Sequence, residues 1–145
     1  MIESVEEFLR KKDWKYFENF VSEIFETHGF KTKLHYRFKG KRKREVDVLA
    51  WNDLYVFLIE CKKWGKHRYK TYQLKKTCEK LNEIKKEFVT STLFPIRKRK
   101  VFAIIITLFD ESISFYKNVP IVPLSKLNYF ILNVESILED VDFYK

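Results

Sequence analysis

Residues 45–62 contain the side chains that could carry out chemistry. Two apolar runs flank an Asn-Asp turn, so this stretch is expected to form a β-hairpin. Asp47 lies at the start of the first run, and Glu60 and Lys62 lie at the end of the second. Charged groups are costly to bury unless they are paired or bind a metal. Two carboxylates and one ammonium group are therefore expected to converge at one functional site.

Pairing across the hairpin determines which of these side chains meet. The expected turn makes Trp51 face Leu54. Asp47 then faces Leu58, and Glu60 is its diagonal neighbour on the same sheet face, about 7–8 Å away between backbones. The lysine two residues later follows on that face, because side chains alternate along a strand. A slip of one residue would send Asp47 to the opposite face.

An Asp and a Glu at this position form a hard oxygen site that suits Mg²⁺ or Mn²⁺. The main-chain carbonyl of Cys61 is placed to add a ligand, and waters would complete the coordination shell. Such an ion polarises a phosphodiester and stabilises the charge that builds in the transition state. Lys62 could orient or activate the attacking water. The pattern indicates metal-assisted hydrolysis of a phosphodiester.

The positive charge of the chain is concentrated around this hairpin. Residues 31–100 contain 22 Lys and Arg against 7 Asp and Glu, a net charge of +15, whereas the remainder has 7 against 13, a net charge of −6. This asymmetry favours a polyanionic partner. Three basic segments are expected to contact phosphates. Their side chains are Lys39, Lys41, Arg42, Lys43, Arg44, Lys63, Lys66, Arg68, Arg97, Lys98, Arg99 and Lys100.

The elements around the hairpin predict an α/β fold. Strands that alternate with helices give a mixed central sheet flanked by helices. The 145 residues fit one domain with one substantial core, so residues 1–145 are expected to form a single domain. Segment 112–117 is compatible with either a strand or a helix. The other expected elements are helices over 2–10, 14–28, 71–88, 124–131 and 134–141, and strands over 30–38, 101–108 and 121–122.

Glu18 lies on the helix expected over residues 14–28. Asp13 is placed to cap the N-terminus of this helix, and Gly29 is placed to end it. Glu18 lies beside the apolar stripe rather than opposite it. Spacing alone leaves it open whether Glu18 is a solvated glutamate or part of a site.

Several classes of site and location are not favoured. No apolar run reaches the ~18 residues of a membrane span, and the N-terminus does not resemble a signal peptide, so a cytoplasmic protein without a membrane partner is expected. Cys61 and Cys78 lack metal-binding spacing and are expected to be reduced thiols. The histidines lack zinc spacing. His28 and His35 are interpreted as structural or surface residues, and His67 lies near the hairpin without a favoured role.

Residues 14–107 resemble the PD-(D/E)xK, or restriction-endonuclease-like, nucleases. They are most similar to archaeal Holliday-junction resolvases and Mrr-type restriction endonucleases. Glu18 stands before Gly29-Phe30 as a helix glutamate stands before a Gly-Phe helix stop in these families. Asp47 occupies the first hairpin strand, and Glu60-Cys61-Lys62 forms the Glu-x-Lys of the second. Val46 replaces the proline of the motif.

The resemblance implies a restriction-endonuclease-like core and a metal-dependent DNA endonuclease. Glu18 would join Asp47 and Glu60 around the ion, and Lys62 would position the nucleophile. Gln73 would support the site, as a glutamine on the following helix often does in Mrr-type proteins. The alternative is a catalytically inactive nucleic-acid-binding module on the same fold.

The substrate and the oligomeric state remain open at this point. The DNA could be a four-way junction, a methylated duplex, a flap or a single strand. A junction resolvase needs two sites about a twofold axis, which would require a homodimer. The apolar segment 121–138 could form a dimer interface or belong to the core, and the sequence leaves both open.

Overall fold

The computed structural model describes residues 2–63, 71–91, 93–111 and 114–139. The strands are β1 Lys31–Lys39, β2 Lys43–Trp51, β3 Tyr55–Lys62, β4 Lys100–Thr107, β5 Phe115–Tyr116 and β6 Val119–Pro123. The helices are α1 Val5–Arg10, α2 Trp14–Thr27, α3 Thr71–Ser91, α4 Leu127–Leu132 and α5 Val134–Leu138, and a short 3-10 turn covers Leu124–Lys126.

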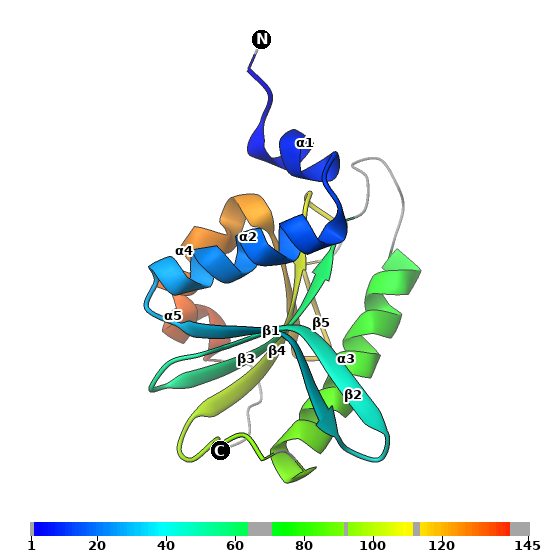
Figure 1. Ribbon diagram of the computed structural model, residues 1–145, viewed down its shortest axis with the longest axis vertical. Helices are drawn as coiled ribbons and strands as arrows, with labels where there is room; N and C mark the ends of the chain where they lie inside the picture. The colour runs from blue at the N-terminus through cyan, green and yellow to red at the C-terminus, as the bar shows by residue number, and fades with distance from the viewer. Residues whose placement is uncertain (1, 64–70, 92, 112–113, 140–145) are drawn as a thin grey trace.

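The strands form one mixed sheet in the order β1-β2-β3-β4-β6-β5 (Figure 1). β1, β2 and β3 are antiparallel, β3, β4 and β6 are parallel, and β5 runs antiparallel to β6. Helix α3 covers one face of the sheet, and α2 and α4 cover the other. The expected α/β class, with a mixed central sheet flanked by helices, is confirmed. Segment 112–117, which could have been strand or helix, contributes β5, and residues 112 and 113 lie outside the described part.

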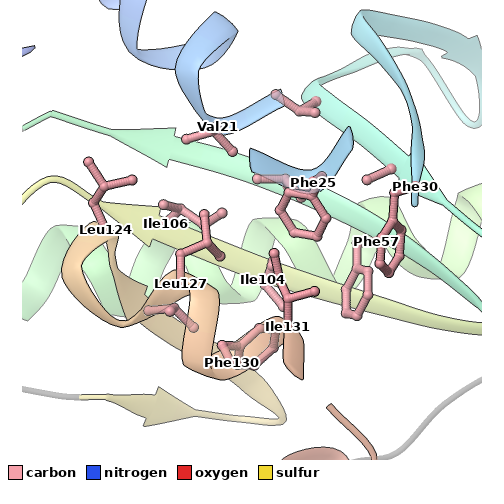
Figure 2. Packing of buried hydrophobic residues seen from close by; sticks show 14 of the residues in the cluster. Val21, Phe25, Phe30, Phe57, Ile104, Ile106, Leu124, Leu127, Phe130 and Ile131 are labelled. Atoms are coloured by element: carbon pink, nitrogen blue, oxygen red, sulfur yellow. The ribbon is translucent and has the colours of Figure 1, made fainter. Parts of the chain in front are cut away.

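Both faces of the sheet carry an apolar core. On the α2 side, Phe57 lies at the centre of a cluster of aromatic rings (Figure 2). On the α3 side, the buried stripe of the long helix packs against the sheet. β3 and β4 are therefore buried on both faces, which explains their nearly continuous apolar sequence. The buried residues of α3 include Leu74, Cys78, Leu81, Ile84 and Phe88.

The apolar C-terminal segment belongs to this core. Leu124, Leu127, Phe130 and Ile131 pack against the α2 side of the sheet (Figure 2). Of the two interpretations left open for segment 121–138, the structure favours ordinary core. No helix among the described residues combines the length and apolar character needed to cross a membrane.

The limits of α2 follow from its flanking residues as expected. Asp13 Oδ1 accepts a hydrogen bond from the N–H of Tyr16 at 3.0 Å, which satisfies one of the free donors of the first turn. Gly29 adopts a φ of +85°, in the left-handed region that favours glycine after a helix. These local signals fix the position of Glu18 along the helix axis.

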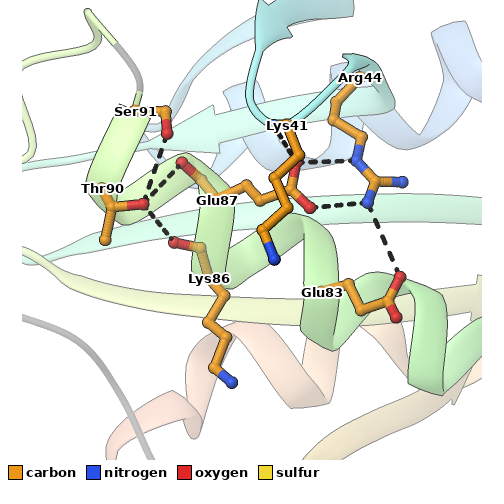
Figure 3. A network of polar contacts seen from close by, with 7 residues as sticks. All are labelled: Lys41, Arg44, Glu83, Lys86, Glu87, Thr90 and Ser91. Atoms are coloured by element: carbon orange, nitrogen blue, oxygen red, sulfur yellow. Dashed lines mark hydrogen bonds and ion pairs between the residues drawn. The ribbon is translucent and has the colours of Figure 1, made fainter.

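An ion pair fixes the β1–β2 hairpin to α3 (Figure 3). Arg44 donates two hydrogen bonds to Glu87, from Nε to Oε1 at 3.0 Å and from Nη2 to Oε2 at 2.7 Å. The main-chain N–H of Lys41 donates to the same carboxylate at 3.0 Å. A Cβ on Gly40 would lie 2.1 Å from Glu87 Oε1, so the close approach requires glycine. The hydrogen bonds from Arg44 hold the pKa of Glu87 at about 2.

This arrangement corrects one expectation. Arg44 was expected to contact phosphates, but its side chain is only 8% exposed and its guanidinium is engaged by Glu87. Arg44 therefore positions the hairpin from within, and its neighbours Lys41 and Arg42 are the exposed cations of the turn.

Replacing Arg44 with Ala should destabilise the protein. The change leaves the Glu87 carboxylate without its bidentate partner in a largely enclosed position. We expect the melting temperature to fall by several degrees, measured by circular dichroism. The matched control is Arg42→Ala at an exposed position of the same turn, which should change the melting temperature little. Equal effects of the two substitutions would contradict the structural role of Arg44.

Candidate metal centre

The β2–β3 hairpin differs in register from the expected pairing. Trp51 pairs with Val56 rather than with Leu54. The reason is Asn52, whose Oδ1 accepts hydrogen bonds from the N–H groups of Leu54 and Tyr55 at 2.9 and 2.8 Å. These bonds make Asn52 the first residue of the turn, as asparagine often is. The shift is two residues, so the paired residues Val48–Trp51 keep their expected faces.

The corrected register changes the expected alignment of the two hairpin acids. Leu58, the expected partner of Asp47, pairs with Leu49 instead. A regular continuation of this register would set Asp47 opposite Glu60, a direct rather than a diagonal neighbour. The recorded pairing stops one residue short of Asp47, and there the N–H of Cys61 donates to Asp47 Oδ2 at 2.8 Å. The carboxylate thus takes the place of a main-chain acceptor where the strands diverge.

Glu18 reaches the same place from α2. Glu18 is 4% exposed, because it lies on the part of the helix that packs against the sheet. Single ligand atoms from Glu18, Asp47 and His35 all lie within 4.8 Å of one another. Glu18 Oε1 is buried and accepts no well-aligned hydrogen bond from any described residue, although His35 Nε2 lies 2.8 Å away.

His35 is the member of this cluster that sequence reasoning missed. It was interpreted as a structural or surface residue. In β1, however, its neighbours Leu34 and Tyr36 pair with Val48 and Val46, the two residues that flank Asp47 in β2. Its Nε2 contacts Glu18 Oε1, and its Nδ1 lies 3.0 Å from Glu45 Oε2. The edge of the imidazole meets the Trp14 ring at 5.5 Å between centroids. The signal that could have found it is the register of β1 on β2, which no local pattern provides.

Burial and mutual repulsion make the acids difficult to ionise together. Burial, followed by the charge of Asp47, raises the pKa of Glu18 to about 7. Burial also raises the pKa of Asp47, and burial followed by the charge of Asp47 raises the pKa of Glu60. Lys62 partly offsets this repulsion with its Nζ 3.2 Å from Glu60 Oε2. The site therefore concentrates negative charge that a cation would stabilise.

This donor set fits a hard divalent cation. A buried carboxylate oxygen without a hydrogen-bond donor is costly, and Glu18 Oε1 is such an atom. Carboxylate oxygens are the ligands that Mg²⁺ and Mn²⁺ favour. The half-buried Cys61 follows Glu60 on the same strand, so its carbonyl stays a candidate ligand.

Two other expected site residues are placed differently. Gln73 lies exposed in the first turn of α3, and no hydrogen bond links its side chain to the acids within the described residues. Lys63 donates from Nζ to the carbonyls of Arg10, at 3.3 Å, and Lys12, which ties the end of β3 to the end of α1. Lys66, His67 and Arg68 lie outside the described residues.

The basic segment 97–100 lies away from the acids. Lys100 pairs with Tyr55 at the start of β3, about 16 Å along the strand from Glu60. Arg99 donates to main-chain carbonyls, from Nε to Asn52 at 2.6 Å and from Nη1 to Pro95 at 2.9 Å. Arg99 therefore supports the β2–β3 turn, whereas phosphate contact by the exposed Arg97 and Lys98 stays a prediction.

Comparisons with known proteins agree with this picture of the fold. Residues 9–92 match a family model of the Mrr type that is described as restriction endonuclease. This match includes Glu18, Asp47, Glu60 and Lys62. An uncharacterized protein of Archaeoglobus fulgidus is 30% identical over 131 residues, which cover 90% of this chain and 98% of that protein.

A solved structure is also similar. The crystal structure of the protein of unknown function AF1548 superposes with a TM-score of 0.56 at 20% sequence identity. The similarity covers 86% of this chain and 67% of that one. At this identity the likeness concerns the fold alone.

The raised pKa of Glu18 predicts a pH-dependent stability in the absence of metal. Because the folded state holds this proton more tightly than the unfolded state, the contribution is complete below about pH 4.5 and is lost as the pH rises through about 7. Glu18→Gln should remove this decline. In a chelating buffer, we expect the melting temperature of the variant to rise relative to that of the wild type between pH 5 and pH 8.

The control for this measurement is Glu23→Gln, an exposed glutamate on the same helix. This variant should follow the wild-type pH profile. Parallel profiles for the wild type and Glu18→Gln would show that Glu18 does not titrate in the way its burial indicates.

Proposed function

Because this chain belongs to the Mrr-type restriction endonuclease family, and with it to the PD-(D/E)xK nuclease superfamily, we propose that it is a metal-dependent endonuclease that hydrolyses phosphodiester bonds in DNA. The observation that carries the proposal is the cluster of ligand atoms from the buried Glu18 and the half-buried Asp47 and His35, with the charge of Glu60 acting on the same site. The charge of Asp47 raises the pKa of both Glu18 and Glu60, and a bound cation would relieve this repulsion.

The acids would hold the ion, Mg²⁺ or Mn²⁺, with the Cys61 carbonyl as a further ligand. When bound, the ion would polarise the scissile phosphate and stabilise the charge of the transition state. The Asp47 carboxylate is fixed by the N–H of Cys61, which reduces its freedom before any ligand arrives. Lys62 lies beside Glu60 on β3, so its ammonium would orient the attacking water at the phosphate.

The tip of the β1–β2 hairpin supplies the best-placed surface for the DNA backbone. Lys39, Lys41, Arg42 and Lys43 are exposed there, and Arg44 fixes the turn that presents them. The hairpin continues directly into the strand segment that carries Asp47. Cations at this position would position the phosphate backbone without reading base sequence. Because such contacts do not depend on base sequence, both a plasmid duplex and a four-way junction serve as test substrates.

A homodimer would accompany cleavage of a four-way junction. The C-terminal core residues are already buried, so a dimer would use another surface or the exposed residues of α4, Tyr129 and Leu132. The mass of the protein in solution, measured with and without a junction, tests this part of the proposal.

Asp47→Asn should abolish DNA cleavage. The substitution removes one charged ligand while keeping the shape of the side chain, and losing several kcal/mol of transition-state stabilisation lowers the rate by at least about a hundredfold. The assay follows nicking of supercoiled plasmid and cleavage of a four-way junction with Mg²⁺ or Mn²⁺. Asp53→Asn is the matched control, because Asp53 is exposed in the hairpin turn.

Two outcomes would contradict this function. Equal cleavage by Asp47→Asn and the wild type would exclude the proposed site. DNA binding without cleavage under any divalent ion would identify the chain as a catalytically inactive nucleic-acid-binding module.

Replacing Lys39, Arg42 and Lys43 together by Ala should lower the affinity for DNA. It should also make that affinity less dependent on salt concentration. Each lost phosphate contact lowers the slope of log K against log salt concentration by about 0.9 on duplex DNA, so the slope should fall by up to about 2.7. Fluorescence anisotropy at several salt concentrations measures this. Arg97→Ala with Lys98→Ala, at the other end of the sheet, is the control. An equal change of slope in the control would show that the hairpin tip is not the specific contact surface.

A further inference from the structure

We propose that His35 is a nitrogen ligand of the ion at this site, and that it makes the site select a transition ion such as Mn²⁺ or Co²⁺ over Mg²⁺. The inference deepens the proposed function and rests on it, because it concerns the ion that Glu18 and Asp47 would hold. Imidazole suits transition ions, whereas Mg²⁺ favours oxygen ligands and water. None of the site residues implied by the family resemblance contributes a nitrogen ligand.

The spacing of the donor atoms fits this role. An octahedral ion with bonds of about 2.1 Å separates adjacent ligand atoms by about 3.0 Å and opposite ones by about 4.2 Å. His35 Nε2 and Glu18 Oε1 are 2.8 Å apart, close to the adjacent separation. The ligand atoms of Glu18, His35 and Asp47 all fall within 4.8 Å of one another. Glu18 Oε1 is also the buried atom without a hydrogen-bond partner among the described residues, so an ion would give it the partner that it lacks.

A second carboxylate holds the imidazole in the form that binds metal. Glu45 Oε2 lies 3.0 Å from His35 Nδ1, and Arg37 Nε donates to Glu45 Oε1 at 2.7 Å. With Nδ1–H donating to Glu45, the lone pair of Nε2 is left for the ion. A histidine ligand that donates its other N–H to a carboxylate is the usual arrangement of a metal-bound imidazole. Glu45 and Arg37 are therefore positioning residues for His35.

The backbone at His35 supports a functional constraint. Its φ of +51° is in the left-handed region, which is uncommon for a residue other than glycine. The strand changes faces there, because Leu34 packs with the α2-side core and Tyr36 with the α3-side core. Such backbone strain persists where surrounding structure demands a particular side-chain direction. Here that direction brings the imidazole to Glu18 and Asp47.

The experiment compares metal binding by the full chain after removal of metal with a chelator. Isothermal titration calorimetry measures the affinities for Mn²⁺, Co²⁺ and Mg²⁺. We expect His35→Ala to weaken Mn²⁺ and Co²⁺ binding by about 10- to 100-fold and Mg²⁺ binding far less. Glu45→Gln should weaken the same two ions in the same direction. His28→Ala is the matched control, because His28 lies outside the cluster with its Nε2 2.9 Å from Asn128 Oδ1.

A spectroscopic measurement keeps the inference testable even where His35→Ala fails to fold. Pulsed electron paramagnetic resonance of the Mn²⁺-loaded protein should show coupling to an imidazole nitrogen. The chain has three histidines, so a variant with both His28 and His67 replaced by Ala should retain this coupling. Absence of nitrogen coupling in that variant would overturn the inference. So would equal Mn²⁺ affinity of the wild type and a folded His35→Ala variant.

Failure of this inference and failure of the proposed function give different results. DNA cleavage that depends on Asp47, without nitrogen coupling, leaves the endonuclease in place and removes His35 from the ligands. Nitrogen coupling from His35 without cleavage of any DNA supports the ligand assignment and removes the endonuclease.

Discussion

The hydrogen bond from the Cys61 N–H to the Asp47 carboxylate is the contact on which the candidate site depends. It occurs where the pairing of β2 and β3 ends, and it replaces a main-chain acceptor by a charged side chain. A carboxylate held in this way stays close to Glu60 and Glu18 despite their repulsion. The energy that keeps these acids together comes from the apolar packing of α2 and α3 on the two faces of the sheet. A site of concentrated charge is thus maintained by a rigid apolar scaffold.

The sheet changes its geometry at the same place. Val46 packs with the α3-side core and Val48 with the α2-side core, so β2 reverses its faces at Asp47 just as β1 does at His35. Residues in regular strands would point alternately to the two cores and leave no position between them. The reversal therefore gives two polar side chains a place between the cores, near the edge of the sheet that Glu18 reaches from α2.

The positive charges of the chain serve two different purposes. Arg44 and Arg99 are engaged with protein partners, and Lys63 joins β3 to α1. These cations hold the hairpins and the N-terminal helix in position. The exposed cations of the β1–β2 turn remain for a polyanion. Net charge therefore indicated a kind of partner, whereas contacts decided which cations stay exposed.

The sequence by itself determined the elements and the chemical character of the site. Asp13 and Gly29 delimit α2 through local contacts and backbone conformation. The acids of the hairpin could be recognised in the sequence because they lie at the ends of apolar runs. Only the tertiary structure decided the register, the inclusion of His35 and the engagement of Arg44 with a residue 43 positions away. The physical reason is the distance along the chain over which each interaction acts. Capping and periodicity act over one or two turns of chain, whereas strand register and buried ion pairs depend on which distant groups the packed core brings together.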